Sequence, residues 1–262
     1  MKRVCIVTGG SNGIGKATAE LLAENGYTVY EFSRGGKDYG SVRHVTADVT
    51  DPVQVRAAVQ SVLDAEGSID LLVSNAGFGI SGAVEFTDPA DAHAQIDVNF
   101  FGALHCVQAV LPSMRAAKRG HIVLISSVAA PIAIPFQSFY SATKAAINSL
   151  TLALRNEVKP FGVKVCAVLP GDVKTGFTAA RKKSLAGAEV YGKALEHAVA
   201  VMEHDEQSGM PPVRIAKAVL AAANEKNPRA FRTVGFQYRL FVFLAKLLPA
   251  TWVNALVGMI YR

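Results

Sequence analysis

The chain has 262 residues, of which 50% are hydrophobic and 18% are charged. This composition excludes a disordered chain, which needs low hydrophobicity and high net charge, and the length suits one domain with a large core. The formal net charge of +6 favours an anionic ligand such as a phosphorylated cofactor. No nucleic-acid partner is expected, because no dense basic stripe exists and the run at 181–183 is typical of a solvated face.

The cysteines and histidines predict neither a disulfide nor a metal site. The three Cys are scattered through apolar segments without a CxxC pair, which indicates reduced packing residues and a cytoplasmic location. The six His show no metal-ligand spacing, so no required metal is expected. The N-terminus runs directly into an apolar segment at 4–7, with no signal-peptide pattern.

Apolar runs alternate with amphipathic segments along the chain. In chain order they predict a strand at 4–8, a helix at 13–25, strands at 27–32 and 42–47, a helix at 52–66, a strand at 69–74, a helix at 90–114, a strand at 121–126, a helix at 138–159 and a strand at 163–169. Gly26 ends the first helix, and Asp51 with Pro52 begins the second. Continuous apolar strands that alternate with helices predict an α/β fold with a doubly wound parallel sheet (Rossmann-type), three layers and a single domain over 1–262.

Two segments after the last predicted strand are less regular. Residues 176–210 are rich in small and charged side chains, and they predict either a mobile segment that covers the site or a surface helical hairpin. Residues 236–262 form an apolar C-terminal extension, interrupted by Lys246 and Pro249, with no run long enough to span a membrane. We expect this extension to pack on the core or form a subunit interface, with contact to a membrane surface as the alternative.

A glycine-rich turn lies between the first predicted strand and the first predicted helix. Its spacing is Gly9-x3-Gly13-x-Gly15 rather than the commoner GxGxxG. Such a turn lets backbone N–H groups approach a pyrophosphate at a helix N-terminus, so it predicts a dinucleotide site. The residues expected to contact the dinucleotide here are Gly9, Ser11, Asn12, Gly13, Ile14 and Gly15.

The end of the second predicted strand selects between the two nicotinamide cofactors. An acidic residue there would bind the ribose 2′-hydroxyl of NAD, but this chain has Ser33 and Arg34. An Arg can hold a 2′-phosphate through paired charge-assisted hydrogen bonds, so the sequence predicts NADP(H). Glu31 lies nearby, but on a strand it should face away from Phe32, and its role is not assigned.

Tyr140 and Lys144 stand at i and i+4 in a predicted helix, thirteen residues after Ser127. This spacing places both side chains on one face of the helix. A free Tyr has a pKa of about 10, so a working pKa near 7 needs about 4 kcal/mol of differential stabilisation, which a nearby ammonium can supply. The pair therefore predicts a Tyr that donates or accepts a proton.

These motifs together resemble the short-chain dehydrogenase/reductase family, in its single-domain branch of about this length. The resemblance covers residues 1 to about 235 and rests on an ordered set of short segments. They are TGGSNGIG at 8–15, ADV at 47–49, SNAG at 74–77, DVN at 97–99, ISS at 125–127, YSATK at 140–144 and PGDVKT at 170–175.

The resemblance implies four catalytic residues. Tyr140 resembles the general acid/base that protonates the substrate oxygen during reduction, and Lys144 the residue that lowers its pKa and binds the nicotinamide ribose. Ser127 resembles the Ser that holds the substrate carbonyl, and Asn99 the Asn that helps to hold a water relay behind the Lys.

It also implies further cofactor contacts: Asp48 and Val49 at the adenine, Asn75, Ala76 and Gly77 in a supporting turn, and Pro170, Gly171, Val173 and Thr175 around the nicotinamide. Two positions depart from the family pattern. Ser74 replaces a more usual Asn, and Ala130 replaces a Gly, which can reshape the substrate pocket.

The implied activity is an NADP(H)-dependent oxidoreductase that interconverts a secondary alcohol and a ketone. Apolar residues suggest a lipophilic substrate of the steroid or retinoid type; the candidates are Phe78, Ile80, Val128, Ile132, Ile134, Phe136, Phe139 and Phe177. One alternative is a 3-oxoacyl-thioester reductase of fatty-acid synthesis, and another is a non-catalytic NADP-binding regulator. The resemblance further implies a homodimer or homotetramer that pairs through the long helices at 90–114 and 138–159.

Overall fold

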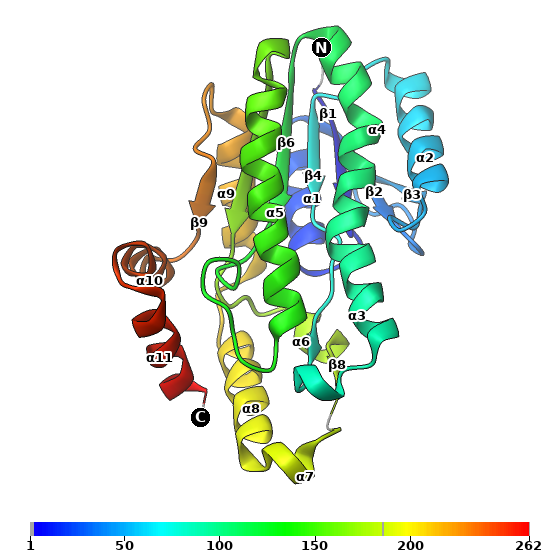
Figure 1. The fold of residues 1–262 in the computed structure, drawn as a ribbon. Coiled ribbons are helices and arrows are strands. Elements are labelled where there is room, and N and C mark those ends of the chain that lie inside the picture. Colours follow the sequence, from blue (N-terminus) through cyan, green and yellow to red (C-terminus); the bar gives the residue numbers. More distant parts are fainter. Residues whose placement is uncertain (1–2, 185, 262) are drawn as a thin grey trace.

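The computed structural model describes residues 3–184 and 186–261, which form three layers around one large sheet (Figure 1). Seven strands pair in parallel in the order β3-β2-β1-β4-β6-β7-β9. They are β1 (Arg3–Thr8), β2 (Tyr27–Ser33), β3 (Val42–Thr46), β4 (Leu71–Ser74), β6 (Gly120–Ile125), β7 (Val163–Leu169) and β9 (Phe231–Thr233). The chain runs outward from β1 in both directions, so the predicted doubly wound sheet is confirmed.

The helices are α1 (Gly13–Glu24), α2 (Pro52–Glu66), α3 (Pro89–Ile96), α4 (Gly102–Ala117), α5 (Ser138–Glu157), α6 (Phe177–Ala180), α7 (Ala188–Tyr191), α8 (Lys193–Gln207), α9 (Pro212–Asn224), α10 (Phe236–Leu247) and α11 (Ala250–Ile260). Short helical turns lie at η1 (Val84–Phe86), η2 (Asp97–Phe101) and η3 (Lys159–Phe161). A second, small sheet pairs β5 (Ile80–Ser81) with β8 (Lys182–Lys183).

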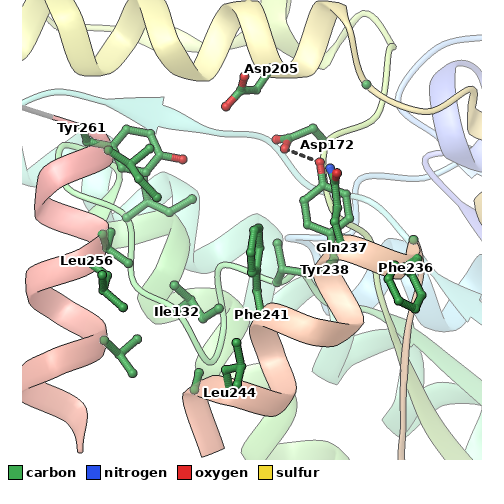
Figure 2. A pocket seen from close by; sticks show the side chains of 18 of the residues that line it. Ile132, Asp172, Asp205, Phe236, Gln237, Tyr238, Phe241, Leu244, Leu256 and Tyr261 are labelled. Atoms are coloured by element: carbon green, nitrogen blue, oxygen red, sulfur yellow. Dashed lines mark hydrogen bonds between the residues drawn. The ribbon is translucent and has the colours of Figure 1, made fainter. Parts of the chain in front are cut away.

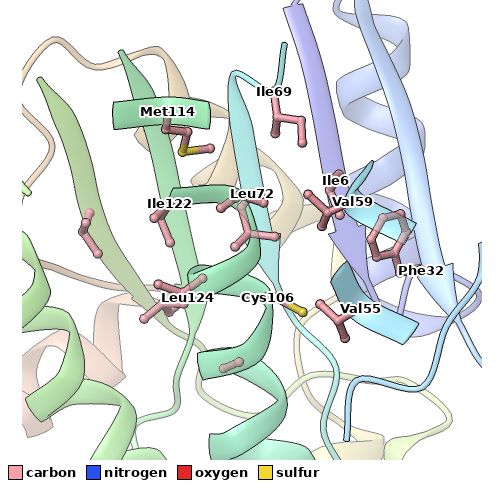
Figure 3. Close-up of a cluster of buried hydrophobic side chains, with 14 of the residues drawn as sticks. Ile6, Phe32, Val55, Val59, Ile69, Leu72, Cys106, Met114, Ile122 and Leu124 are labelled. Atoms are coloured by element: carbon pink, nitrogen blue, oxygen red, sulfur yellow. The ribbon is translucent and has the colours of Figure 1, made fainter. Parts of the chain in front are cut away.

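Apolar side chains fill the space on both faces of the sheet. On one face, α2, α4 and α5 cover a cluster that includes Leu72, Ile122 and Leu124, all fully buried (Figure 3). On the other face, α1 and α9 cover a second cluster, and the two helices pack against each other. All four residues of β4 are buried, which is why this strand is a continuous apolar run in the sequence.

The predicted strands and helices are observed with small changes at their ends. The helix expected at 90–114 is divided, because a π-helical turn at η2 inserts an extra residue per turn between α3 and α4. Strand β9 has only three residues and was not predicted, since so short a segment carries no clear apolar pattern. The segment 176–210 is largely helical where it is described, with α8 as its longest element.

The apolar C-terminal extension forms α10 and α11, which lie beside the body after β9 (Figure 1). Only Val242 and Val257 of these helices are buried. The extension therefore packs on the core through few of its residues, and most of its large apolar side chains are exposed. Within the described part of the chain, none of the helices has the length and apolar character to cross a membrane.

Candidate active site

Because the seven strands are parallel, the loops that follow them meet at one edge of the sheet. The glycine-rich turn follows β1, Arg34 follows β2, and Asn75 follows β4. Ser127 lies two residues after β6, and Pro170 follows β7. The fold thus brings the predicted site residues to the same edge, although they are spread over more than 160 positions.

The glycine-rich turn needs glycine for steric reasons. Gly9 and Gly13 have φ values of +63° and +54°, which disfavour other residues. A Cβ on Gly15 would lie 2.1 Å from the Gly9 carbonyl oxygen, and a Cβ on Gly13 would lie 3.4 Å from the Thr175 Cβ. The exposed Ser11 and Asn12 precede α1, and the first turn of α1 carries no acidic residue. This open helix N-terminus fits an anionic group.

Thr8 and Asn75 hold the glycine-rich turn in place through hydrogen bonds. The Asn75 amide nitrogen Nδ2 donates to the carbonyl oxygens of Thr8 (3.0 Å) and Gly9 (3.2 Å). The Thr8 hydroxyl accepts from the backbone N–H groups of Asn75 (2.9 Å) and Ala76 (3.0 Å). Thr8 is fully buried. The sequence did not predict this role of Thr8, because its hydrogen-bond partner Asn75 is 67 positions away.

At the end of β2 the structure separates Arg34 from Glu31. Arg34 is exposed, so its guanidinium is accessible to a ligand. Glu31 is fully buried, pairs with the His44 imidazole and accepts from the Ser33 hydroxyl at 3.2 Å. A Cβ on Gly10 would lie 2.6 Å from the Glu31 Cβ. Glu31 therefore supports the glycine-rich turn from beneath, on the side of the sheet opposite Phe32, as the strand alternation predicts.

The residues predicted at the adenine end lie beside the entrance to α2. The Asp48 carboxylate accepts from the backbone N–H (2.9 Å) and the hydroxyl (2.8 Å) of Thr50, so its side chain shapes the loop after β3. Val49 is buried, and a Cβ on Gly102 would lie 2.7 Å from it. The close approach of Gly102 positions this loop against the start of α4.

Ser127 lies beside Tyr140, close enough for its hydroxyl to influence the pKa of the Tyr140 phenol. The Ser127 oxygen also accepts from the Ala129 backbone N–H at 3.0 Å. Burial raises the pKa of Tyr140 to about 12, and the Ser127 hydroxyl lowers it only in part. The expectation that Lys144 brings this pKa near 7 is therefore wrong for the chain alone, because burial outweighs the nearby ammonium. The Tyr140 ring contacts that of Phe177 on α6, with centroids 5.6 Å apart.

Lys144 is buried one helical turn after Tyr140. Its ammonium donates to the Ile125 carbonyl at 2.8 Å and lies 5.5 Å from the centre of the Tyr140 ring. The Ser126 hydroxyl donates to the Lys144 carbonyl at 3.2 Å, so two hydrogen bonds join α5 to the end of β6. Burial lowers the pKa of Lys144 to about 8. The ammonium lies under the Tyr140 ring, as the i, i+4 spacing predicts.

Asn99 lies on the π-helical turn η2, where the extra residue turns its side chain inward. Its Oδ1 accepts from the Phe78 backbone N–H at 3.0 Å, and its Nδ2 donates to the Phe78 carbonyl at 3.0 Å. Nδ2 also donates to the Thr143 hydroxyl at 3.2 Å, which itself donates to the Tyr140 carbonyl at 2.8 Å. Asn99 therefore connects the loop after β4 to the helix that carries Tyr140 and Lys144.

The loop after β7 is held by the C-terminal extension. The Pro170 carbonyl accepts from the Val128 N–H at 2.9 Å. The Tyr238 ring on α10 covers Gly171, where a Cβ would lie 2.3 Å from it, and the Tyr238 hydroxyl donates to Asp172 at 2.6 Å (Figure 2). Further along, Val173 bridges to Met210.

The basic run at 181–183 differs from the expectation. Arg181 is buried, pairs with Glu206 of α8 and lies over the Phe177 ring at 5.6 Å. Lys182 and Lys183 are exposed, as a solvated face requires. The expectation is wrong for Arg181, because the turn between α6 and β8 directs this one side chain inward.

A cavity of about 980 Å³ opens between the loop after β6, the start of α9 and the two C-terminal helices (Figure 2). Three predicted pocket residues line it: Val128, Ile132 and Ile134. Aromatic and aliphatic side chains of α10 and α11 form the opposite wall, and Asp172 and Asp205 lie at its polar end (Figure 2). Ser127 and Tyr140 are not among its lining residues, but Val128 directly follows Ser127 in the chain. The lining residue Asp172 lies close enough to Tyr140 to raise the pKa of its phenol.

The other predicted pocket residues lie elsewhere. Phe177 covers Tyr140, and Phe136 packs against Tyr191 of α7 at 5.8 Å between ring centroids. Ile80 is buried in β5, and the backbone N–H of Phe78 donates a hydrogen bond to Asn99. Sequence reasoning also missed Tyr238 and Asp172, because their pairing depends on how α10 folds back onto the loop after β7.

The comparisons with known proteins agree with this arrangement. Residues 3–186 match the family model of the short chain dehydrogenases. A 3-ketodihydrosphingosine reductase of Bacteroides thetaiotaomicron is 42% identical over 88% of this chain and 87% of its own length. The structure of a short chain dehydrogenase of Burkholderia cenocepacia with NADP has a TM-score of 0.78, 27% identity and coverage of 98% and 97% of the two chains. That of a Burkholderia phymatum relative with NAD has a TM-score of 0.79, 25% identity and coverage of 94% and 92%.

Replacement of Gly15 by Ala tests the close approach in the glycine-rich turn. We expect Gly15→Ala to cost about 3 kcal/mol of unfolding free energy, because the new Cβ would overlap a backbone oxygen. Thermal unfolding should then occur about 10 °C lower. Gly258→Ala is the matched control, since a Cβ there meets nothing within 4 Å. Equal stability of the two variants would contradict the tight turn.

Proposed function

Because the chain belongs to the short-chain dehydrogenase/reductase family of oxidoreductases, we propose that it uses NADPH to reduce the ketone of a long-chain, lipophilic substrate. The observation that carries this proposal is the position of the Ser127–Tyr140 pair next to a large apolar cavity. The pair supplies groups for a carbonyl oxygen, and the cavity supplies room for a hydrocarbon chain.

The cofactor site is assigned from the fit of the residues at the sheet edge. The glycine-rich turn and the open N-terminus of α1 suit a pyrophosphate, and Arg34 is free to hold a 2′-phosphate. Asn75, Ala76 and Gly77 would support the cofactor from β4, and Thr175 would approach it from beside Gly13. The bound cofactor supplies the hydride.

In this proposal Ser127 and Tyr140 both hydrogen-bond the substrate carbonyl, and they stabilise the negative charge that builds on its oxygen. The phenol of Tyr140 donates the proton, because its raised pKa keeps it protonated at neutral pH. Lys144 holds its ammonium beneath the ring and so stabilises the phenolate that remains. Asn99 keeps the helix that carries both residues in place.

The substrate class is inferred from the cavity and from the relative named for 3-ketodihydrosphingosine. That molecule is a long-chain ketone that carries an amine. The apolar walls of the cavity suit the chain, and Asp172 and Asp205 at its polar end suit a cationic amine. These carboxylates favour such a substrate over a steroid or retinoid, which has no amine.

Two further functions are tested by the same experiments. A 3-oxoacyl-thioester reductase would use the same catalytic residues on a different carbonyl. A non-catalytic NADP-binding regulator would bind the cofactor and reduce neither substrate.

We also propose a homodimer or homotetramer that pairs through α4 and α5. Phe101, which ends η2 directly before α4, and Leu152 on α5 are 42% and 46% exposed, which provides apolar surface for such an interface.

Tyr140→Phe should reduce kcat by more than a hundredfold, because the proton donor is lost while the ring and its contact with Phe177 remain. NADPH binding, measured by fluorescence titration, should stay within about twofold of the native protein. A variant that keeps more than a few per cent of kcat would contradict the role of Tyr140 as acid.

Arg34→Ala should weaken NADPH binding by at least tenfold, because a charge-assisted contact with the 2′-phosphate contributes roughly 1.5–3 kcal/mol. NADH binding should change little, since NADH lacks that phosphate. Isothermal titration with both cofactors measures the difference, and an equal loss for both would exclude Arg34 as the selecting residue.

The substrate assignment is tested with 3-ketodihydrosphingosine, an amine-free ketone of equal chain length and a 3-oxoacyl thioester. We expect the amino ketone to have the highest kcat/KM with NADPH. Asp172→Asn should lower kcat/KM for the amino ketone by about tenfold and leave the amine-free ketone nearly unchanged, because a charge-assisted contact is lost while Asn can still accept from Tyr238.

Preference for the thioester would favour the fatty-acid function. Tight NADPH binding without turnover of any of the three would favour the regulator.

A further inference from the structure

Helix α10 presents an outward row of large apolar side chains. Phe236, Leu240, Phe243 and Leu247 follow the spacing i, i+4, i+7 and i+11, which places them on one side of a helix. They are 83%, 46%, 57% and 66% exposed. A row of four such residues is unusual on a protein surface that contacts only water.

Helix α11, which follows a short turn at Pro249, also carries exposed large apolar side chains. Trp252, Leu256, Met259 and Ile260 are exposed on it, and Trp252 and Met259 are each 64% exposed. We call these eight residues of α10 and α11 the apolar face. Trp is enriched where an apolar layer meets water, because its ring is apolar and its N–H is polar.

The cavity accounts for only half of the apolar face. Its lining includes Phe236, Leu256, Met259 and Ile260, together with Phe241 and Leu244 of α10 (Figure 2), but not Leu240, Phe243, Leu247 or Trp252. The two helices thus have an inner side that contacts the body and the cavity, and an outer side at Leu240, Phe243, Leu247 and Trp252 that has no partner in the described chain.

The charges of the chain are distributed unequally. Residues 226–262 contain six Lys and Arg and no Asp or Glu. Of the 27 basic residues, 21 remain in the rest of the chain, which equals its 21 acidic residues. The whole net charge of +6 therefore lies in the C-terminal 37 residues. Arg239 and Lys246 are exposed on α10, and their spacing places both along one border of the row of apolar residues.

A second copy of the chain fits this face poorly. A twofold interface would bring the same surface of two subunits together, so Arg239 and Lys246 would meet basic residues of the partner without any acidic group from this segment. An anionic lipid surface fits both features, because it offers apolar chains to the row and negative headgroups to the cations.

We propose that α10 and α11 dock the protein on an anionic lipid membrane, with the apolar face inserted at the headgroup boundary and Arg239 and Lys246 against the headgroups. The docking places the cavity, whose wall is formed by the same two helices, beside the bilayer. If the proposed function holds, a lipid substrate then reaches the cavity without crossing water.

The test is co-sedimentation of the full chain, without cofactor or substrate, with phosphatidylcholine vesicles that contain about one-third phosphatidylserine. We expect binding to these vesicles, weaker binding to pure phosphatidylcholine, and a decrease as salt is raised. Because no turnover is measured, failure of this test and failure of the proposed function are separate results.

Leu240→Glu combined with Phe243→Glu should reduce vesicle binding by about a hundredfold, since two apolar anchors are replaced by anions. Lys246→Glu alone should reduce vesicle binding by about thirtyfold. The substitution changes the charge by two units, and each unit changes binding by roughly fivefold. Val53→Glu is the matched control, because Val53 is 64% exposed on α2, away from the apolar face, and it should bind like the native protein. Circular dichroism and thermal unfolding show that each variant is folded.

Equal binding to charged and neutral vesicles would overturn the role of the cations, and no binding to either would overturn the docking. If Leu240→Glu with Phe243→Glu converts an oligomer to smaller species in light scattering without a change in vesicle binding, the face is a subunit interface and the proposal is wrong.

Discussion

The site depends on the hydrogen bond between the buried Lys144 ammonium and the Ile125 carbonyl. Ile125 ends β6, and Ser127 follows two residues later, so this bond fixes the distance between the loop that carries Ser127 and the helix that carries Tyr140. The Ser126 hydroxyl makes the return contact to the Lys144 carbonyl. Burial of an ammonium opposes folding, and the lowered pKa of Lys144 reflects that cost. Despite this cost, the protein keeps the Lys144 ammonium at a buried position beneath the Tyr140 ring.

The proposed cofactor and substrate regions are joined by a chain of short polar contacts. Thr8 and Asn75 connect the loops after β1 and β4, and Asn99 connects the second of these loops to α5 through Thr143. A shift of the glycine-rich turn would therefore move the helix that bears Tyr140. The π-helical turn η2 serves this connection, since a regular helix through this segment would rotate Asn99 away from Phe78.

The sequence was sufficient for six of the seven strands of the large sheet and for the edge at which the predicted site residues lie. Six strands were predicted because buried parallel strands are continuous apolar runs, and their parallel arrangement carries Gly9, Ser127 and Pro170 to one edge. The burial of Glu31 and Arg181 was not predicted, because each is paired with a partner distant in sequence, His44 or Glu206. The same holds for Tyr238, whose contact with Gly171 exists only after α10 has folded back on the loop after β7. Local patterns identify elements and motifs, but they do not identify such pairs.

The C-terminal extension shows how one segment can satisfy two environments. Its inner side is committed to the body, where Tyr238 covers Gly171 and holds Asp172 at the polar end of the cavity. Its outer side keeps large apolar residues and positive charge, although exposed apolar surface lowers solubility. A balanced charge over residues 1–225 and a purely basic segment after it are hard to explain if water is the only neighbour of both. They are explained if the body faces water and the extension faces an anionic surface, with the cavity between them.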